Sequence, residues 1–132
     1  MDAGKWPLML CFVAFVILPV EGPRFLAGPS AAPDGPIRSL VLQILGAGSS
    51  RGTAFPSAHV AASVVAGICA LRFQRPLGVA ILIVTVGMMV GAVYGGYHYA
   101  ADVVAGLGMG LAAAAIARAA EAFIVARSTA RR

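Results

Sequence analysis

Residues 77–97 read LGVAILIVTVGMMVGAVYGGY, and residues 98–106 continue directly with HYAADVVAG. The first stretch carries no charged side chain, and we predict that it crosses a membrane as a helix. The second stretch places His98 and Asp102 four residues apart within an apolar run. A charged side chain near the middle of a membrane helix costs about 2.5–3.5 kcal/mol, so this pair indicates a function.

Positions i and i+4 share one face of a helix, so the Asp102 carboxylate is expected to reach the His98 imidazole. A carboxylate beside one ring nitrogen fixes the tautomer and raises the basicity of the other nitrogen. We interpret the pair as the chemical centre of the protein.

The amino-acid composition is that of an integral membrane protein. Of the 132 residues, 60% are hydrophobic and 11% are charged, and the mean hydropathy is +0.89. Soluble domains are about 45–50% apolar and about 25% charged. The net charge of +5 comes mainly from scattered arginines that do not interleave with aromatic residues, which argues against nucleic-acid binding. Cys11 and Cys69 show neither metal-ligand spacing nor a secreted disulfide pattern.

We therefore expect an all-α, polytopic membrane helix bundle that forms a single domain over residues 1–132. About four transmembrane helices are predicted, at residues 6–20, 57–71, 77–97 and 100–125, with an outer loop at 21–56. The first run is only about 22 Å long as a helix. It is either a short span or the apolar core of a signal peptide, and we favour the span.

Positive charges predict the orientation of these spans. The turn at 72–76 and the C-terminus carry arginines, which the positive-inside rule places in the cytoplasm, and Lys5 places the N-terminus there too. The protein is thus expected in the cell membrane as a multi-pass protein, with both termini cytoplasmic and His98 facing outside.

The outer loop departs from that rule because it carries Arg24, Arg38 and Arg51. Such departures are expected where residues have a function. Within the loop, the apolar residues of 37–45 fall at helical spacing, which predicts a short amphipathic helix on the membrane surface or over the site.

Glycines recur at fourfold spacing in the later spans, at Gly87, Gly91 and Gly95 and again at Gly106 and Gly110. This spacing fits either a homodimer interface or close packing of the chain's own helices. We favour the second interpretation.

The second histidine, His59, follows Pro56 and Ser57, which are typical of helix starts. One span inward, a tight turn and one span outward separate it from His98. We therefore expect the two histidines to face one another at the outer end of an antiparallel helix pair.

A helix start offers free N–H groups and a positive dipole end to an anion. Arg24 and Arg51 lie on the same side and are expected to complete a phosphate clamp. Two histidines beside such a clamp suit phosphoryl transfer, in which one imidazole attacks phosphorus and the other protonates the leaving oxygen.

Two blocks resemble the type 2 phosphatidic acid phosphatase superfamily. Residues 55–61, FPSAHVA, are similar to its PSGH-type block, and residues 94–106, YGGYHYAADVVAG, are similar to its HxxxD block. Residues 18–24, LPVEGPR, resemble the proline-rich segment of the inositol phosphorylceramide synthase-like branch. The resemblance covers residues 18 to about 111.

The resemblance implies a role for each matched residue. His98 is the expected nucleophile that forms a phosphohistidine, Asp102 orients it, and His59 is the general acid. Ser57 and Arg24 are expected to hold phosphate oxygens. We add Arg51 as a substrate-binding residue from its position and charge. The family pattern needs no cofactor and no metal, and we favour this over a zinc site built from the histidines and Asp102.

Five positions depart from the phosphatase pattern. Gly91 and Ala92 occupy the places of its Ser-Arg pair, and Ile17 occupies the place of a lysine. Phe25 follows Arg24 in the place of a proline, and Ala58 replaces the usual glycine. Family members also usually have six spans, so the first two are expected to be absent here.

The expected activity is therefore that of a phosphatase for a lipid phosphate or pyrophosphate in the bilayer, with its active site at the outer face. The alternatives are a transferase that passes the phosphoryl headgroup to an alcohol and a non-catalytic remnant or helix-packing protein. The two alternatives for a protein partner are a second copy of the chain and a separate two-span segment.

Overall fold

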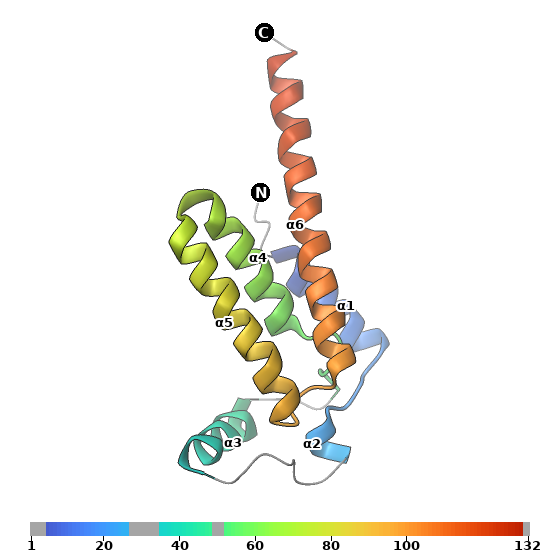
Figure 1. Ribbon diagram of the computed structural model, residues 1–132. Helices are drawn as coiled ribbons and strands as arrows, with labels where there is room; N and C mark the ends of the chain where they lie inside the picture. Colours follow the sequence, from blue (N-terminus) through green and yellow to red (C-terminus); the bar gives the residue numbers. More distant parts are fainter. Residues whose placement is uncertain (1–4, 27–34, 49–51, 131–132) are drawn as a thin grey trace.

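The computed structural model describes residues 5–26, 35–48 and 52–130 and confirms the predicted all-α bundle (Figure 1). The helices are α1 (Lys5–Ile17), α2 (Pro23–Leu26), α3 (Pro36–Gly48), α4 (Ala58–Phe73), α5 (Arg75–Tyr94) and α6 (Ala100–Thr129).

Two helices, α5 and α6, are long and apolar enough to cross a membrane. α4 is apolar but has 16 residues, and α1 has 13. α1 ends at Ile17, before the predicted boundary at 20, because Pro19 lacks an N–H group and disfavours helical backbone at the residue before it. That α1 and α4 also cross the membrane stays a prediction.

The outward surface of α5 is apolar. Ile83, Val84 and Val90 are 66%, 70% and 65% exposed. Water-soluble monomers rarely expose contiguous apolar surface on this scale. Such a surface is compatible with the hydrocarbon chains of a bilayer, so the protein is a membrane protein.

α4 lies at the centre of the bundle, where it packs against α5 on one side and α6 on the other, while α1 touches α4 and α6. Val60 and Val64 of α4 and Val103 of α6 form the buried core. In contrast, α3 packs on none of the other described helices and lies near the end of the bundle where α5 ends (Figure 1).

Glycines let these helices approach closely. A Cβ atom at Gly78 of α5 would collide with the backbone of Leu71 in α4, and one at Gly110 of α6 would lie 2.8 Å from the Ala61 carbonyl oxygen. The interpretation of the Gly106 and Gly110 pair as internal packing is confirmed. A Cβ at Gly87 or Gly91 would meet nothing within 4 Å in the described part of the chain, so the favoured interpretation as internal packing is wrong for these two glycines, and the alternative of a homodimer interface is untested.

We predict that Gly78→Ala lowers the free energy of unfolding in detergent micelles by about 1–3 kcal/mol, because the Leu71 backbone cannot move aside. Gly87→Ala is the matched control on the same helix. Its new methyl group meets nothing within 4 Å, and alanine favours helix over glycine by about 1 kcal/mol. Denaturant titrations followed by circular dichroism measure both variants, and equal effects would contradict the close α4–α5 contact.

Candidate functional site

One end of the bundle brings together backbone segments that are far apart in the sequence. Val20 and Thr53 form a parallel bridge, in which the Ala54 N–H donates to the Val20 carbonyl at 3.1 Å. A Cβ atom at Gly22 would lie 2.9 Å from the Tyr97 carbonyl oxygen. The segment that leads into α2 therefore lies against the turn that carries His98.

A glycine turn positions the backbone of His98. Gly95 ends α5, and Gly96 has a φ of +73°, a conformation that glycine adopts without strain. The N–H groups of Tyr97 and His98 both donate to the Ala92 carbonyl, at 2.9 and 3.1 Å. His98 is thus held directly against the end of α5.

Asp102 is buried in the first turn of α6, with its side chain 3% exposed. Its Oδ2 atom accepts the Tyr99 N–H at 2.9 Å. This bond satisfies a backbone donor at the helix start, where a carboxylate also interacts favourably with the helix dipole. One oxygen of Asp102 is therefore fixed before any ligand binds.

The His98 Nδ1 atom lies 3.4 Å from the same Asp102 Oδ2 atom. That separation exceeds the usual 2.7–3.2 Å of an N–H···O hydrogen bond. Nδ1 is buried and has no hydrogen-bond partner within the described part of the chain. Such bonds are often long in enzymes without substrate and tighten on binding. Asp102 is therefore positioned to become the acceptor for this nitrogen.

The backbone conformation that brings His98 and Asp102 together differs from the predicted one. His98 precedes α6, which begins at Ala100, so the two residues do not share one helical face. Tyr99 is the cap residue of α6, and the backbone folds there so that His98 and Asp102 lie side by side.

Ser57 ties the start of α4 to the start of α6. Its N–H donates to the Asp102 carbonyl oxygen at 3.0 Å, and a Cβ atom at Gly106 would collide with the Ser57 carbonyl oxygen. The residue is 1% exposed, and its hydroxyl does not cap α4. The free N–H groups of the first turn of α4 consequently begin beside the Asp102 backbone.

His59 lies in the first turn of α4, two residues after Ser57, and its side chain is exposed. The structure therefore gathers Ser57, His98 and Asp102 and places His59 at the same end of the bundle. Arg24 belongs to α2, but its side chain lies outside the described structure, as does all of Arg51.

Sequence reasoning assigned Gly106 to helix packing but missed the contacts that Gly22 and Gly106 make at the site. Both lie inside or beside the motif segments, yet their role depends on which backbone comes near, and one sequence does not reveal that. The Ala92 carbonyl was also missed, because a backbone acceptor leaves no mark in the sequence. Within the described residues, no three His, Cys, Asp or Glu side chains converge as metal ligands.

Residues 5–116 match the model of the PAP2 superfamily. A search of curated proteins and a search of solved structures each return no match. The matched range includes the bundle end just described, with His59, His98 and Asp102. It confirms the superfamily that the sequence resembles, and the inositol phosphorylceramide synthase-like branch stays a prediction.

We predict that Asp102→Ala destabilises the protein by about 1 kcal/mol, because the Tyr99 N–H loses its acceptor. Asp102→Asn retains an acceptor oxygen, so its free energy of unfolding should fall by less than half as much. Thermal unfolding in micelles compares the two variants. Equal losses would contradict a capping role for this side chain.

Proposed function

The chain belongs to the PAP2 superfamily, whose members are in general phosphatases, and from this premise we propose that it hydrolyses a lipid phosphate or pyrophosphate through a phosphohistidine. The proposed site is the end of the bundle formed by the starts of α4 and α6. We further propose that this end faces the outside of the cell and that both termini are cytoplasmic.

The observation that carries the proposal is the buried contact between His98 Nδ1 and Asp102 Oδ2, at 3.4 Å. An imidazole that donates from Nδ1 to a carboxylate is held in the tautomer whose Nε2 carries the free lone pair. His98 is 18% exposed through its side chain, so the ring is shielded but can be reached. These properties suit a nucleophile.

In the first step, the His98 Nε2 lone pair attacks phosphorus and an N–P bond forms. The P–O bond to the lipid breaks, and His59 gives its proton to the leaving oxygen. In the second step, water loses a proton to His59 and its oxygen attacks phosphorus. The N–P bond then breaks, and inorganic phosphate leaves with His98 restored.

The phosphate oxygens need donors during both steps. The first-turn N–H groups of α4 supply them, together with the Ser57 hydroxyl and the guanidinium groups of Arg24 and Arg51 in our proposal. The apolar outer surface of α5 is in contact with acyl chains, so a lipid substrate reaches the site from within the bilayer.

A phosphotransferase is the second candidate function, and the resemblance of residues 18–24 to the inositol phosphorylceramide synthase-like branch favours it. The segment that resembles the inositol phosphorylceramide synthase-like branch packs at Gly22 against the Tyr97 carbonyl, one residue before the nucleophile. In that case an alcohol, and not water, accepts the phosphoryl group from His98. Adding candidate alcohols to the assay and searching for a new phospholipid product separates the two functions.

We predict that the purified protein releases phosphate from short-chain lipid phosphates without added metal and that His98→Ala abolishes the release. His59→Ala should lower the rate by about 10²–10⁴-fold, because a general acid contributes that much. Brief incubation with ³²P-labelled substrate should label wild type and leave His98→Ala unlabelled. Undiminished activity in both variants would falsify the proposal, and an inactive wild type would favour a helix-packing role.

We predict that Asp102→Asn lowers kcat by about 10- to 100-fold, because the neutral amide holds the imidazole less well. Its unfolding midpoint should remain close to that of the wild type, since the amide oxygen can still accept the Tyr99 N–H. Steady-state kinetics and thermal unfolding on the same preparation measure both quantities. A wild-type kcat in this variant would exclude Asp102 as the orienting group.

A further inference from the structure

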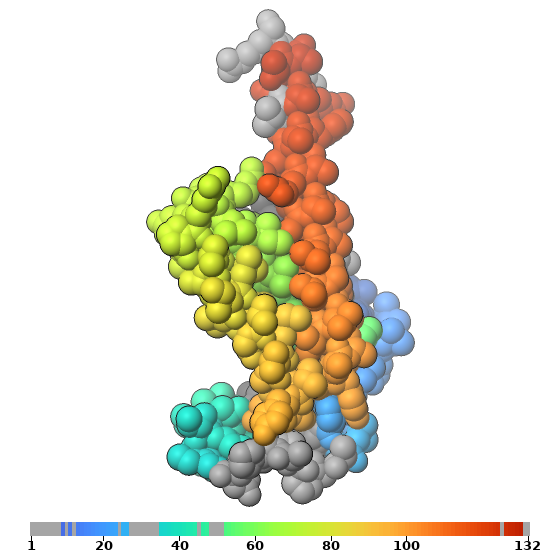
Figure 2. All heavy atoms as spheres, viewed as in Figure 1, coloured from blue at the N-terminus to red at the C-terminus, as the bar shows by residue number. Residues whose placement is uncertain are grey.

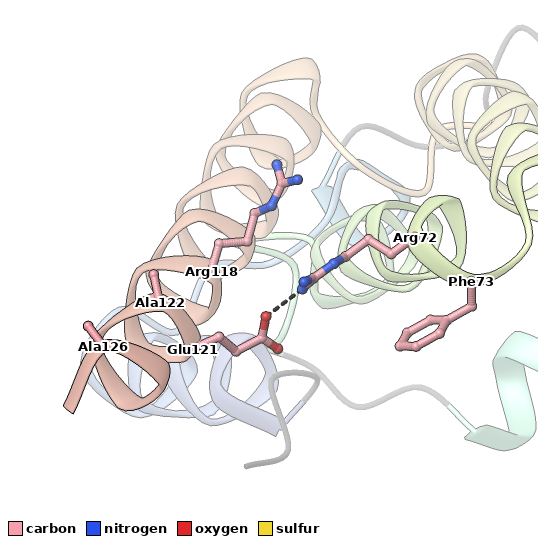
Figure 3. Close-up of a pocket in the computed structure, with 6 residues that line it drawn as sticks. All are labelled: Arg72, Phe73, Arg118, Glu121, Ala122 and Ala126. Atoms are coloured by element: carbon pink, nitrogen blue, oxygen red, sulfur yellow. Dashed lines mark hydrogen bonds and ion pairs between the residues drawn. The ribbon is translucent and has the colours of Figure 1, made fainter. Parts of the chain in front are cut away.

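A pocket of about 730 Å³ lies between α4 and α6 (Figure 3). It is formed by the last turn of α4 and the later part of α6, at the end of the bundle opposite His98, which precedes α6. The C-terminal part of α6 extends beyond α4 and α5 (Figure 2). The lining residues are Arg72, Phe73, Arg118, Glu121, Ala122 and Ala126. The proposed phosphatase reaction uses none of them.

The pocket carries a net positive charge. Arg72 reaches across from α4, and its Nη1 atom bonds to Glu121 Oε2 at 2.5 Å. Glu121 forms an ion pair with Arg72 and also attracts Arg118 at longer range, so the three side chains together leave one positive charge. Arg118 has no hydrogen-bond or ion-pair partner within the described part of the chain. An anionic ligand would neutralise the remaining positive charge.

The depth of the pocket matches that of a phospholipid headgroup. The Ser57–Asp102 hydrogen bond fixes a common starting level for α4 and α6. At 1.5 Å per residue, Arg72 lies about 22 Å along α4 from that level and Arg118 about 24 Å along α6. Long arginine side chains extend further towards the interface of a bilayer with a core of about 30 Å.

One side of the pocket is apolar. Phe73 is 86% exposed, and Ala122 and Ala126 line the α6 side. Phe73 and the two alanines give this side of the pocket an apolar surface, which favours contact with hydrocarbon over contact with water. A free phosphate ion gains nothing from an apolar surface, whereas a lipid can place its glycerol and first methylene groups against it.

We propose that this pocket binds the headgroup of an anionic phospholipid in the leaflet opposite the phosphatase site. Arg118 binds the phosphate, Arg72 contributes its remaining N–H groups, and Phe73 contacts the glycerol region. The bound lipid joins α4 to α6 beside the Arg72–Glu121 ion pair. This lipid is a structural ligand and is not a substrate, so the proposal does not depend on the proposed reaction.

The test is native mass spectrometry of the full chain released from micelles that contain phosphatidylglycerol or phosphatidylcholine. Wild type should retain one phosphatidylglycerol and no phosphatidylcholine. Arg118→Gln should weaken the retention about fivefold, the effect of one arginine near a charged headgroup, and Arg118→Lys should keep most of it. Retained phosphatidylglycerol should also raise the melting temperature of wild type.

Arg127→Gln is the matched control, because Arg127 also projects from α6 but lies over the Phe123 ring, at 5.1 Å, and does not line the pocket. It should retain the lipid as wild type does. An equal loss in Arg118→Gln and Arg127→Gln would overturn the proposal in favour of general surface charge. If an equal concentration of glycerol phosphate displaced the lipid, the proposal that the ligand is a phospholipid would be overturned, because a soluble anion would then bind as well.

Discussion

The hydrogen bond from the Ser57 N–H to the Asp102 carbonyl oxygen is the constraint on which the rest of the arrangement depends. A backbone donor at a helix start has no partner within its own helix, and in a membrane an unpaired donor is costly. Ser57 finds its acceptor on α6, at a place where the missing side chain of Gly106 permits the approach. The depth at which α4 begins is thereby set by α6.

The Ser57–Asp102 hydrogen bond determines where the residues of the proposed site lie. It places the first turn of α4, with His59, at the level of the first turn of α6, with Asp102. The glycine turn after α5 then delivers His98 to the same level. From that end, α4 and α6 share an apolar core that contains Val60, Val64 and Val103, and they separate again at the arginine-lined pocket. Two polar ends are thus connected by one helix pair.

Much of this could be predicted from the sequence, because apolar runs and the His98–Asp102 spacing are local signals. The helical bundle, the pairing of those two residues and the internal packing of Gly110 all follow from such signals. The contact of Gly22 with Tyr97 could not be predicted, since it joins segments that are 75 positions apart. The junction between residues 97 and 100 was predicted, but the shared helical face of His98 and Asp102 was wrong, because His98 lies in the turn that follows Gly96 and precedes α6.

The short length of α4 has a consequence for the lipid. With 16 residues it spans about 24 Å, whereas the 20 residues of α5 span about 30 Å, and the two helices share the turn at Gln74. A bilayer whose hydrocarbon core is as thick as α5 is long therefore extends about 6 Å past the start of α4, at the centre of the bundle. In the proposed function, the start of α4 then lies below the headgroup level of such a bilayer, and a lipid phosphate that moves towards His98 stays within the membrane.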